Sequence, residues 1–504
     1  MELSMEYQSN NVCTVAFSGT GRQPISSDST LPDYCGDIER ILHCSAGIQL
    51  HTVNATADRL RAEGEIELRI LYLTSDGAPD VFEQHIPLSV SLPATELPQE
   101  PVITACASVD YLNCRALSPR KISLNGSVSV QFEVLQKKDE PLISAIADCE
   151  VLPQDIDVSE IVSLAHRTFD LSETLSLPAD APPVGKLIRT QAQPTIASAE
   201  AVENKLLLKG SLLVHVLYLD QSGTIQTLQH ALPISQVLDA PGVKPDSLLA
   251  LCVQQMSLYV QPKRDGADEM RLLDLAAKLS VTIRAFENKT LHAVADCYAT
   301  GAALRPVTKL RSFAKYVKPL QLSMQQEESI ESGLEDCEVL DAAILQIKPK
   351  TETDPDTIEV SADVTVLLLL KDREGSMQAV ERSIELQLSE PLHLDADEVL
   401  FTPDVHAEVR GVHTDGGIIR LSLSLFAEGN IYAAQQTSVL IKAELLETQT
   451  QPDSQLILLF AKEGESLWPI AKRCRSTVTL IQNENDLSQD RLTEDRILLI
   501  PTAG

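Results

Sequence analysis

Short apolar runs follow one another along most of the chain, and each run stops at a polar turn. Three of them line up, namely GEIELRILYLTSDG (64–77), GSLLVHVLYLDQSG (210–223) and ADVTVLLLLKDREG (362–375). Each consists of β-favouring residues followed by Asp, Ser or Glu and a closing glycine, which predicts a strand and a hairpin turn. The starts lie 146 and 152 residues apart. This spacing indicates a duplicated unit of about 150 residues.

Two flanking features keep the same register as these runs. Leu31-Pro32 and Leu177-Pro178 each precede the leading glycine by 33 positions, and the strand endings AIADC (145–149) and AVADC (293–297) lie 148 apart. Several matches at one period favour duplication over chance. The third copy departs most, because Ala362 replaces the leading glycine and TETDPD (351–356) loosens its spacing.

Further strand-like runs lie between these segments, at 121–135, 272–286 and 418–432, while helical periodicity is weak. The pattern therefore predicts a mainly β protein of three tandem antiparallel, sandwich-like repeat domains. We expect them to span 1–150, 151–300 and 301–446. No repeat shows a convergent catalytic set, so a purely structural spacer is an alternative for this region.

A different pattern follows the repeats. The polar stretch ETQTQPDSQ (447–455) is typical of a linker. Beyond it, 456–504 predicts a small βααβ domain: a strand at 456–461, a helix capped by Ser466, a second helix capped by Ser476 or Thr477, and a strand at 496–501.

Composition narrows the function. The formal net charge is −31, which disfavours binding to nucleic acid or to anionic membrane surfaces. The longest apolar run (364–370) is too short to span a membrane, and the first residues lack the pattern of a signal peptide, so we expect a cytoplasmic protein. The ten cysteines and ten histidines show no metal-ligand spacing. His215 lies inside a predicted strand, and we interpret it as a structural residue and not as a metal ligand. We expect no catalytic residues, no metal and no cofactor.

The C-terminal segment resembles a LysM domain. Its motifs are GESLWPIA (464–471), Asn485-Asp486-Leu487 and Leu498-Leu499-Ile500-Pro501. Glu465 and Ser466 replace the usual Asp and Thr, and Cys474 stands where an aromatic residue is frequent. The resemblance implies that ligands bind between the first loop and the loop after the second helix. The candidate ligand- or partner-binding residues are Gly464, Glu465, Ser466, Leu467, Trp468, Gln482, Asn483, Asn485 and Leu487.

Residues in this set have different expected roles. Leu467 should pack the first helix, and Gly464 should permit a tight turn. Trp468, the single tryptophan of the chain, should lie at the rim between the core and the loop. We expect a partner surface to dock across Glu465, Ser466, Trp468, Asn483 and Asn485.

Tandem β repeats followed by a LysM domain resemble the SPOCS-domain proteins of endospore-forming bacteria, of the SipL type. The resemblance implies a non-enzymatic scaffold of spore-coat assembly that acts in the mother cell at the forespore surface. Its LysM module would dock a SpoIVA-type coat morphogenetic ATPase. The alternatives are a protein that binds peptidoglycan or cortex glycan (N-acetylglucosamine chains), and an enzyme whose groups converge only in the fold.

Overall fold

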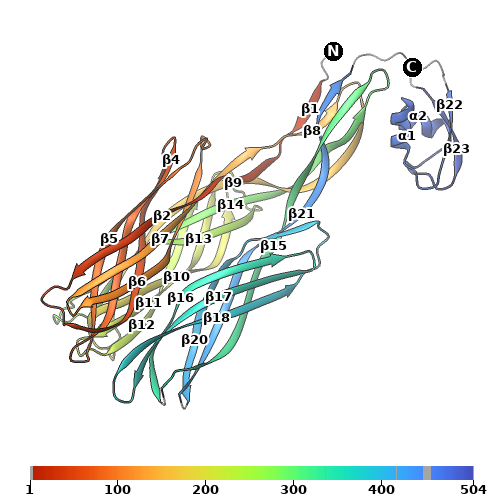
Figure 1. Cartoon of the computed structure of the whole chain (residues 1–504). Helices are drawn as coiled ribbons and strands as arrows, with labels where there is room; N and C mark the ends of the chain where they lie inside the picture. Colours follow the sequence, from red (N-terminus) through yellow and green to blue (C-terminus); the bar gives the residue numbers. More distant parts are fainter. Residues whose placement is uncertain (1–3, 335, 416, 447–455, 503–504) are drawn as a thin grey trace.

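The computed structural model describes residues 4–334, 336–415, 417–446 and 456–502 (Figure 1). The predicted linker at 447–455 lies outside the described residues. The first repeat comprises β1 (Met5–Gln8), β2 (Asn11–Thr30), β3 (Ile38–Ala55), β4 (Arg59–Thr74), β5 (Pro79–Pro93), β6 (Val102–Ser118), β7 (Lys121–Asp139) and β8 (Leu142–Ile146). The second comprises β9 (Glu150–Ser176), β10 (Val184–Val202), β11 (Lys205–Asp220), β12 (Ile225–Asp239), β13 (Leu248–Lys263) and β14 (Leu272–Tyr298). The third comprises β15 (Leu304–Glu331), β16 (Cys337–Thr353), β17 (Thr357–Asp372), β18 (Met377–Pro391), β19 (Glu398–Phe401), β20 (Asp404–Asp415) and β21 (Ile418–Leu445). The C-terminal module comprises β22 (Leu456–Ala461), α1 (Leu467–Cys474), α2 (Val478–Glu484) and β23 (Arg496–Pro501).

All three repeats share one strand order. In each, a three-stranded meander forms one sheet: β3-β4-β5, β10-β11-β12 or β16-β17-β18. The strands on either side of the meander form the second sheet, ordered β2-β7-β6, β9-β14-β13 or β15-β21-β20, and in the third repeat the short β19 also pairs with β21. All pairings are antiparallel, and apolar side chains of the two sheets build one core per repeat. The prediction of a mainly β chain of three antiparallel, sandwich-like repeats is therefore confirmed.

The three aligned segments of the sequence become the central strands of the meanders, β4, β11 and β17. Each strand ends in a turn closed by Gly77, Gly223 or Gly375, with φ angles of 80°, 81° and 89°. A left-handed backbone at this point is the reason for a glycine at the same place in each copy. The turn is thus the local signal that the sequence repeats most faithfully.

The leading glycine has a separate cause. A Cβ on Gly64 or Gly210 would collide with a main-chain carbonyl oxygen of the neighbouring strand. In both copies that strand has a register shift next to the glycine, and the shift presses the backbone inward. In the third copy Ala362 faces Pro349 in regular register, so the alanine is accommodated.

The repeats pack against one another as a closed ring. Strand β10 contacts β4 and β5, β16 contacts β12, and β3 contacts β18. Three leucines at equivalent positions of the aligned segments, Leu71, Leu217 and Leu369, meet in one buried cluster at the contact of all three repeats. Duplication has therefore produced approximate threefold packing within one chain.

Beyond the ring, the longest strands continue as a stem. Strands β9 and β14 have 27 residues each, and β15 and β21 have 28 each. The short pair β1 and β8 supplies the third ribbon, and apolar side chains hold the ribbons together. AVADC lies at the end of β14, whereas AIADC begins at the end of β8 and continues into the turn before β9. Figure 1 shows the module beside the far end of this stem.

Candidate functional site

The C-terminal module folds as its sequence predicted. Strands β22 and β23 pair antiparallel, and α1 and α2 cover one face of this sheet. Ser466 is the N-cap of α1, and its hydroxyl accepts from the backbone N–H of Trp468 (3.4 Å). Of the two candidates for the second cap, Thr477 is used, because its hydroxyl accepts from the N–H of Leu480 (3.1 Å). Ser476 is buried instead and donates to the carbonyl oxygen of Pro501.

Part of the candidate site lies on an exposed loop surface. Gly464 has a φ of 82°, so the tight turn before α1 depends on glycine, as expected. Glu465 and Asn483 are exposed. Gln482 is half-buried and donates to the carboxylate of Asp490 (2.7 Å), and Leu487 closes the turn after α2 with a hydrogen bond from its N–H to the Gln482 carbonyl (2.9 Å).

Two candidate residues lie inside the module. Leu467 is fully buried in its core. Asn485 is buried as well: its amide donates to the carbonyl oxygens of Ile481 (2.8 Å) and Leu499 (2.6 Å), and its carbonyl oxygen accepts from the N–H of Leu499 (2.7 Å). These bonds tie the end of α2 to β23, so Asn485 braces the loop from within. A contact between Asn485 and a partner stays a prediction.

Trp468 has its partner inside the chain. Its indole N–H donates to the carboxylate of Asp296 (3.0 Å), and its ring packs edge-on against Tyr298, with centroids 4.9 Å apart. Lys472, one turn further along α1, donates to both Asp296 oxygens (2.6 and 2.7 Å). The Tyr298 hydroxyl donates to the carbonyl oxygen of Ser476 (2.9 Å). We call these contacts between the tip of β14 and the module the latch.

The electrostatics of the latch suit its hydrogen bonds. Tyr298 is buried, and burial together with the nearby carboxylates of Glu150 and Asp296 raises the pKa of its phenol. The hydroxyl therefore stays protonated and keeps its role as a donor. Asp296 is the acceptor for both Trp468 and Lys472, so a single carboxylate holds the two module side chains.

The sequence did not indicate Asp296 or Tyr298 as functional residues. Asp296 belongs to the repeated AVADC segment, whose counterpart in the first repeat contains Asp148. Besides the exchange of Ile146 for Val294, the copies differ in the residue two positions after the aspartate, which is Tyr298 in the second copy and Glu150 in the first. A lone tyrosine at a strand end carries no signal of a contact with a module 170 residues later.

A second group of polar side chains lies in the first repeat. Potential ligand atoms of Glu67, Glu83 and His85 lie within 4.8 Å of one another on adjacent strands β4 and β5. The guanidinium of Arg69 donates to Glu67 and lies 3.6 Å from Glu83. One fixed cation therefore already pairs with both carboxylates, and the group is an ion-pair network.

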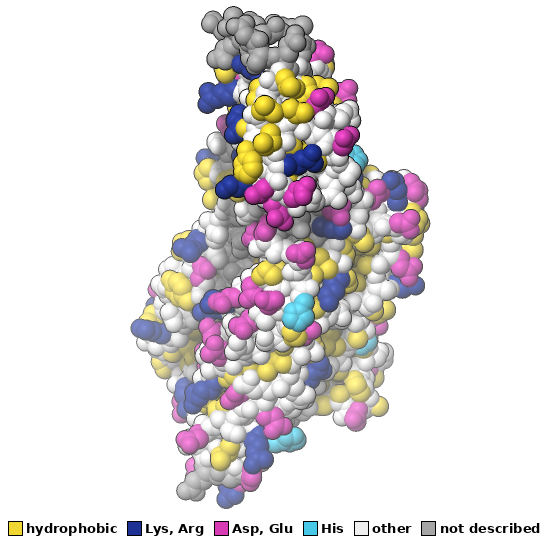
Figure 2. Space-filling model, turned by 90° about the vertical axis from the view of Figure 1, so that its right-hand side faces the viewer, with side chains coloured by type: hydrophobic (Ala, Val, Ile, Leu, Met, Phe, Trp, Pro, Cys, Tyr) yellow, Lys and Arg dark blue, Asp and Glu magenta, His cyan; other side chains and the backbone are white. Residues whose placement is uncertain are grey.

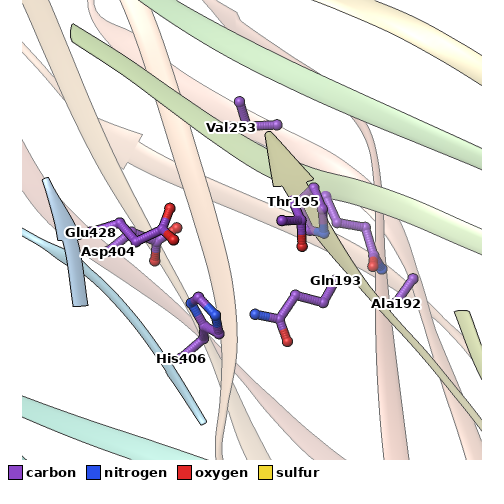
Figure 3. Close-up of a pocket in the computed structure, with 9 residues that line it drawn as sticks. Ala192, Gln193, Thr195, Val253, Asp404, His406 and Glu428 are labelled. Atoms are coloured by element: carbon purple, nitrogen blue, oxygen red, sulfur yellow. The ribbon is translucent and has the colours of Figure 1, made fainter. Parts of the chain in front are cut away.

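A cavity of about 250 Å³ lies between the second and third repeats (Figure 3). Gln193 and Thr195 line it from β10, and Asp404, His406 and Glu428 line it from β20 and β21. Burial raises the pKa of Asp404, whose register partner across the two strands is Glu428. Ala192, Pro194 and Val253 also line the cavity, so its surface mixes polar and apolar side chains.

The architecture thus defines a multidomain β protein with a small βααβ module fastened to its own stem. Residues 37–117 and 183–257 match the family model of the SipL SPOCS domain, and residues 461–501 match that of the LysM domain. The predicted resemblance to SipL-type SPOCS proteins with a C-terminal LysM domain is confirmed. These domains mark a sporulation-related protein with a peptidoglycan-binding type of module. A comparison of the sequence with curated proteins found no match, and a comparison with solved structures found none either.

The matched ranges cover corresponding parts of the first two repeats. The first covers β3 to β6 and the second begins at β10 and ends within β13. The third repeat lies outside both ranges, yet it has the same strand order. None of the helices in the described part of the chain is long and apolar enough to cross a membrane.

Proposed function

We propose that the chain is a non-enzymatic scaffold of spore-coat assembly, acting in the mother cell at the forespore surface. Its LysM module docks a SpoIVA-type coat morphogenetic ATPase, and the ring of SPOCS repeats carries the module on a stem. The observation that supports this most directly is the latch. The one tryptophan of the module is engaged with Asp296 and Tyr298, so this helix face recognises protein side chains.

Binding of a glycan is the second candidate. Sugars are usually recognised by stacking on aromatic rings together with hydrogen bonds to their hydroxyl and acetamido groups. The loop surface offers Glu465, Gln482 and Asn483 for such bonds. Its aromatic ring, Trp468, is already in contact with Tyr298, which leaves the glycan function with polar contacts alone.

Two binding measurements with the full-length protein separate these functions. We expect the protein to bind the purified coat ATPase in solution and not to sediment with purified peptidoglycan. The triple variant Glu465→Ala, Gln482→Ala, Asn483→Ala removes two exposed polar side chains and the half-buried Gln482 from the loop surface. Thr479→Ala, at an exposed position of α2, is the matched control.

The outcomes point in different directions. Sedimentation with peptidoglycan that the triple variant loses and Thr479→Ala keeps, without binding to the ATPase, would establish the glycan function. Binding to the ATPase without sedimentation supports the scaffold. Circular dichroism of each variant checks that the fold is intact.

A further inference from the structure

The sheet of the C-terminal module has an apolar outer face. In β22, the residues that alternate away from the helices are leucine, leucine and phenylalanine, and the residues opposite them in β23 are also apolar. The register pairs are Leu456 with Pro501, Leu458 with Leu499, and Phe460 with Ile497. We call these six residues the outer sheet face. Leu458, Phe460 and Ile497 have 69%, 61% and 63% of their surface exposed.

This face is not needed for the core of the module. The opposite face of the same strands supplies Ala461, Leu498 and Ile500, which are fully buried against the helices. A half-buried antiparallel sheet normally alternates apolar inside with polar outside. Figure 2 shows the hydrophobic side chains gathered at the upper end of the molecule. Contiguous exposed apolar patches are often interaction surfaces, and four residues of this face, Leu456, Leu458, Phe460 and Ile497, are exposed.

The latch determines which way the face points. It holds α1 against the tip of the stem through Trp468 and Lys472. The sheet lies on the other side of the helices, so the outer sheet face is directed away from the stem (Figure 1). The face is therefore accessible while the latch is closed, and a partner can bind there without displacing Trp468.

The adjacent segment 447–455 (ETQTQPDSQ) is a poor candidate to cover this face, because it contains no aliphatic or aromatic residue. A second copy is also unfavourable. Two chains of net charge −31 repel each other. The same charge opposes an anionic membrane surface.

We infer that the outer sheet face docks a partner protein that presents a row of apolar side chains flanked by basic residues. The inference rests on the proposed function, because it identifies the face through which the module engages its protein partner. Charge supports the basic flank: residues 456–504 contain six basic and seven acidic side chains, so nearly all of the −31 lies in the rest of the chain. Figure 2 shows Asp and Glu side chains just below the apolar patch, where the flank would lie.

The test uses the full-length protein and the purified coat ATPase as the probe. Phe460→Glu and, separately, Leu458→Glu place a charge in the centre of the face, and both positions are exposed enough to leave the core intact. An apolar residue at the centre of an interface commonly dominates its affinity, so we expect each variant to weaken binding at least about thirtyfold. Thr479→Glu adds the same charge on the exposed side of α2 and should bind like the wild type.

The controls keep two failures apart. Trp468 fluorescence and circular dichroism verify that each variant keeps its fold and its latch. If the wild type binds the ATPase and the Phe460 and Leu458 variants bind equally well, the inference is overturned and the proposed function stands. If the wild type does not bind the ATPase, the proposed function fails.

If the wild type does not bind the ATPase, sedimentation velocity and flotation with phosphatidylglycerol-containing vesicles test two other occupants of the outer sheet face. Self-association or vesicle binding that Phe460→Glu abolishes would assign the face to a second copy or to a lipid surface, and would overturn the inferred protein partner. Wild-type affinity for the ATPase that falls with added salt supports the basic flank.

Discussion

Removing the carboxylate of Asp296 should open the latch without unfolding either of the parts it joins. Asp296 lies at the end of β14 and is the common acceptor for the Trp468 indole and the Lys472 ammonium. Neither the core of the second repeat nor that of the module includes this side chain. The Asp296→Ala variant should therefore shift the module from docked to undocked while both folds persist.

The size of the effect follows from the bonds that are lost. A hydrogen bond to a charged group contributes about 1.5–3 kcal/mol, and the indole N–H lies 3.0 Å from the carboxylate. The ion pair adds less, because the Asp296 and Lys472 side chains are 25% and 33% exposed and solvent screens their charges. Together they contribute about 2–3 kcal/mol to docking. The docking equilibrium constant should then fall roughly 30- to 140-fold.

The single tryptophan makes docking directly observable. In the closed latch Trp468 is packed against Tyr298, so opening should shift its emission to longer wavelength and increase quenching by acrylamide. Asp296→Asn, which keeps an oxygen for the indole and loses the charge, should give a smaller change. Asp148→Asn, at the corresponding position of the first repeat, should give none. Equal emission and quenching in wild type and Asp296→Ala, with unchanged circular dichroism, would refute the reasoning.

Three further predictions address the rest of the chain. Burial, together with the Arg189 charge, lowers the pKa of His43 to about 4, and its Glu381 neighbour is too exposed to offset this. In the unfolded chain the His43 imidazole has its ordinary pKa of about 6.5, so the unfolded state binds a proton at a higher pH than the folded state does. The folded state therefore keeps its full stability above pH 6.5 and loses about 3 kcal/mol as the pH falls from 6.5 to 4. Urea unfolding at pH 7 and pH 4.5 should show this loss, and His43→Gln should reduce it. Limited proteolysis should cut within 447–455 and release a fragment of about 6 kDa containing Trp468, and a first cut inside a repeat would contradict the domain boundary. If the acidic repeats meet a basic partner, binding by the full chain should fall more steeply with salt than binding by 456–504, and equal slopes would leave the acidity as a solubility feature.

Local signals allowed the sequence to predict much of the fold. Strand composition and the closing glycines located β4, β11 and β17, because the left-handed turn after each strand requires a glycine at the same position in each copy. The module was predicted nearly to the residue, since Ser466 and Thr477 cap its helices and two short apolar runs are its strands. Contacts between distant strands leave no such mark. The closed ring and the long stem depend on packing of residues such as Leu71, Leu217 and Leu369, whose apolar character is equally compatible with separate domains.

The candidate site shows the same limit more sharply. Resemblance to a LysM domain selects positions by motif, and a motif does not distinguish a residue that contacts a ligand from one that holds the loop, as Asn485 does. A motif also does not reveal that other residues of the same chain, here Asp296 and Tyr298, contact Trp468 of the candidate site. Duplication supplied the Asp-Cys pair twice, but Asp148-Cys149 lies in the turn after β8 and Asp296-Cys297 lies within β14. Only the second copy is followed by an aromatic residue, Tyr298, where the first has Glu150. The Tyr298 ring packs on Trp468, and a glutamate offers no ring for this contact, so both differences favour the second repeat as the docking place of the module.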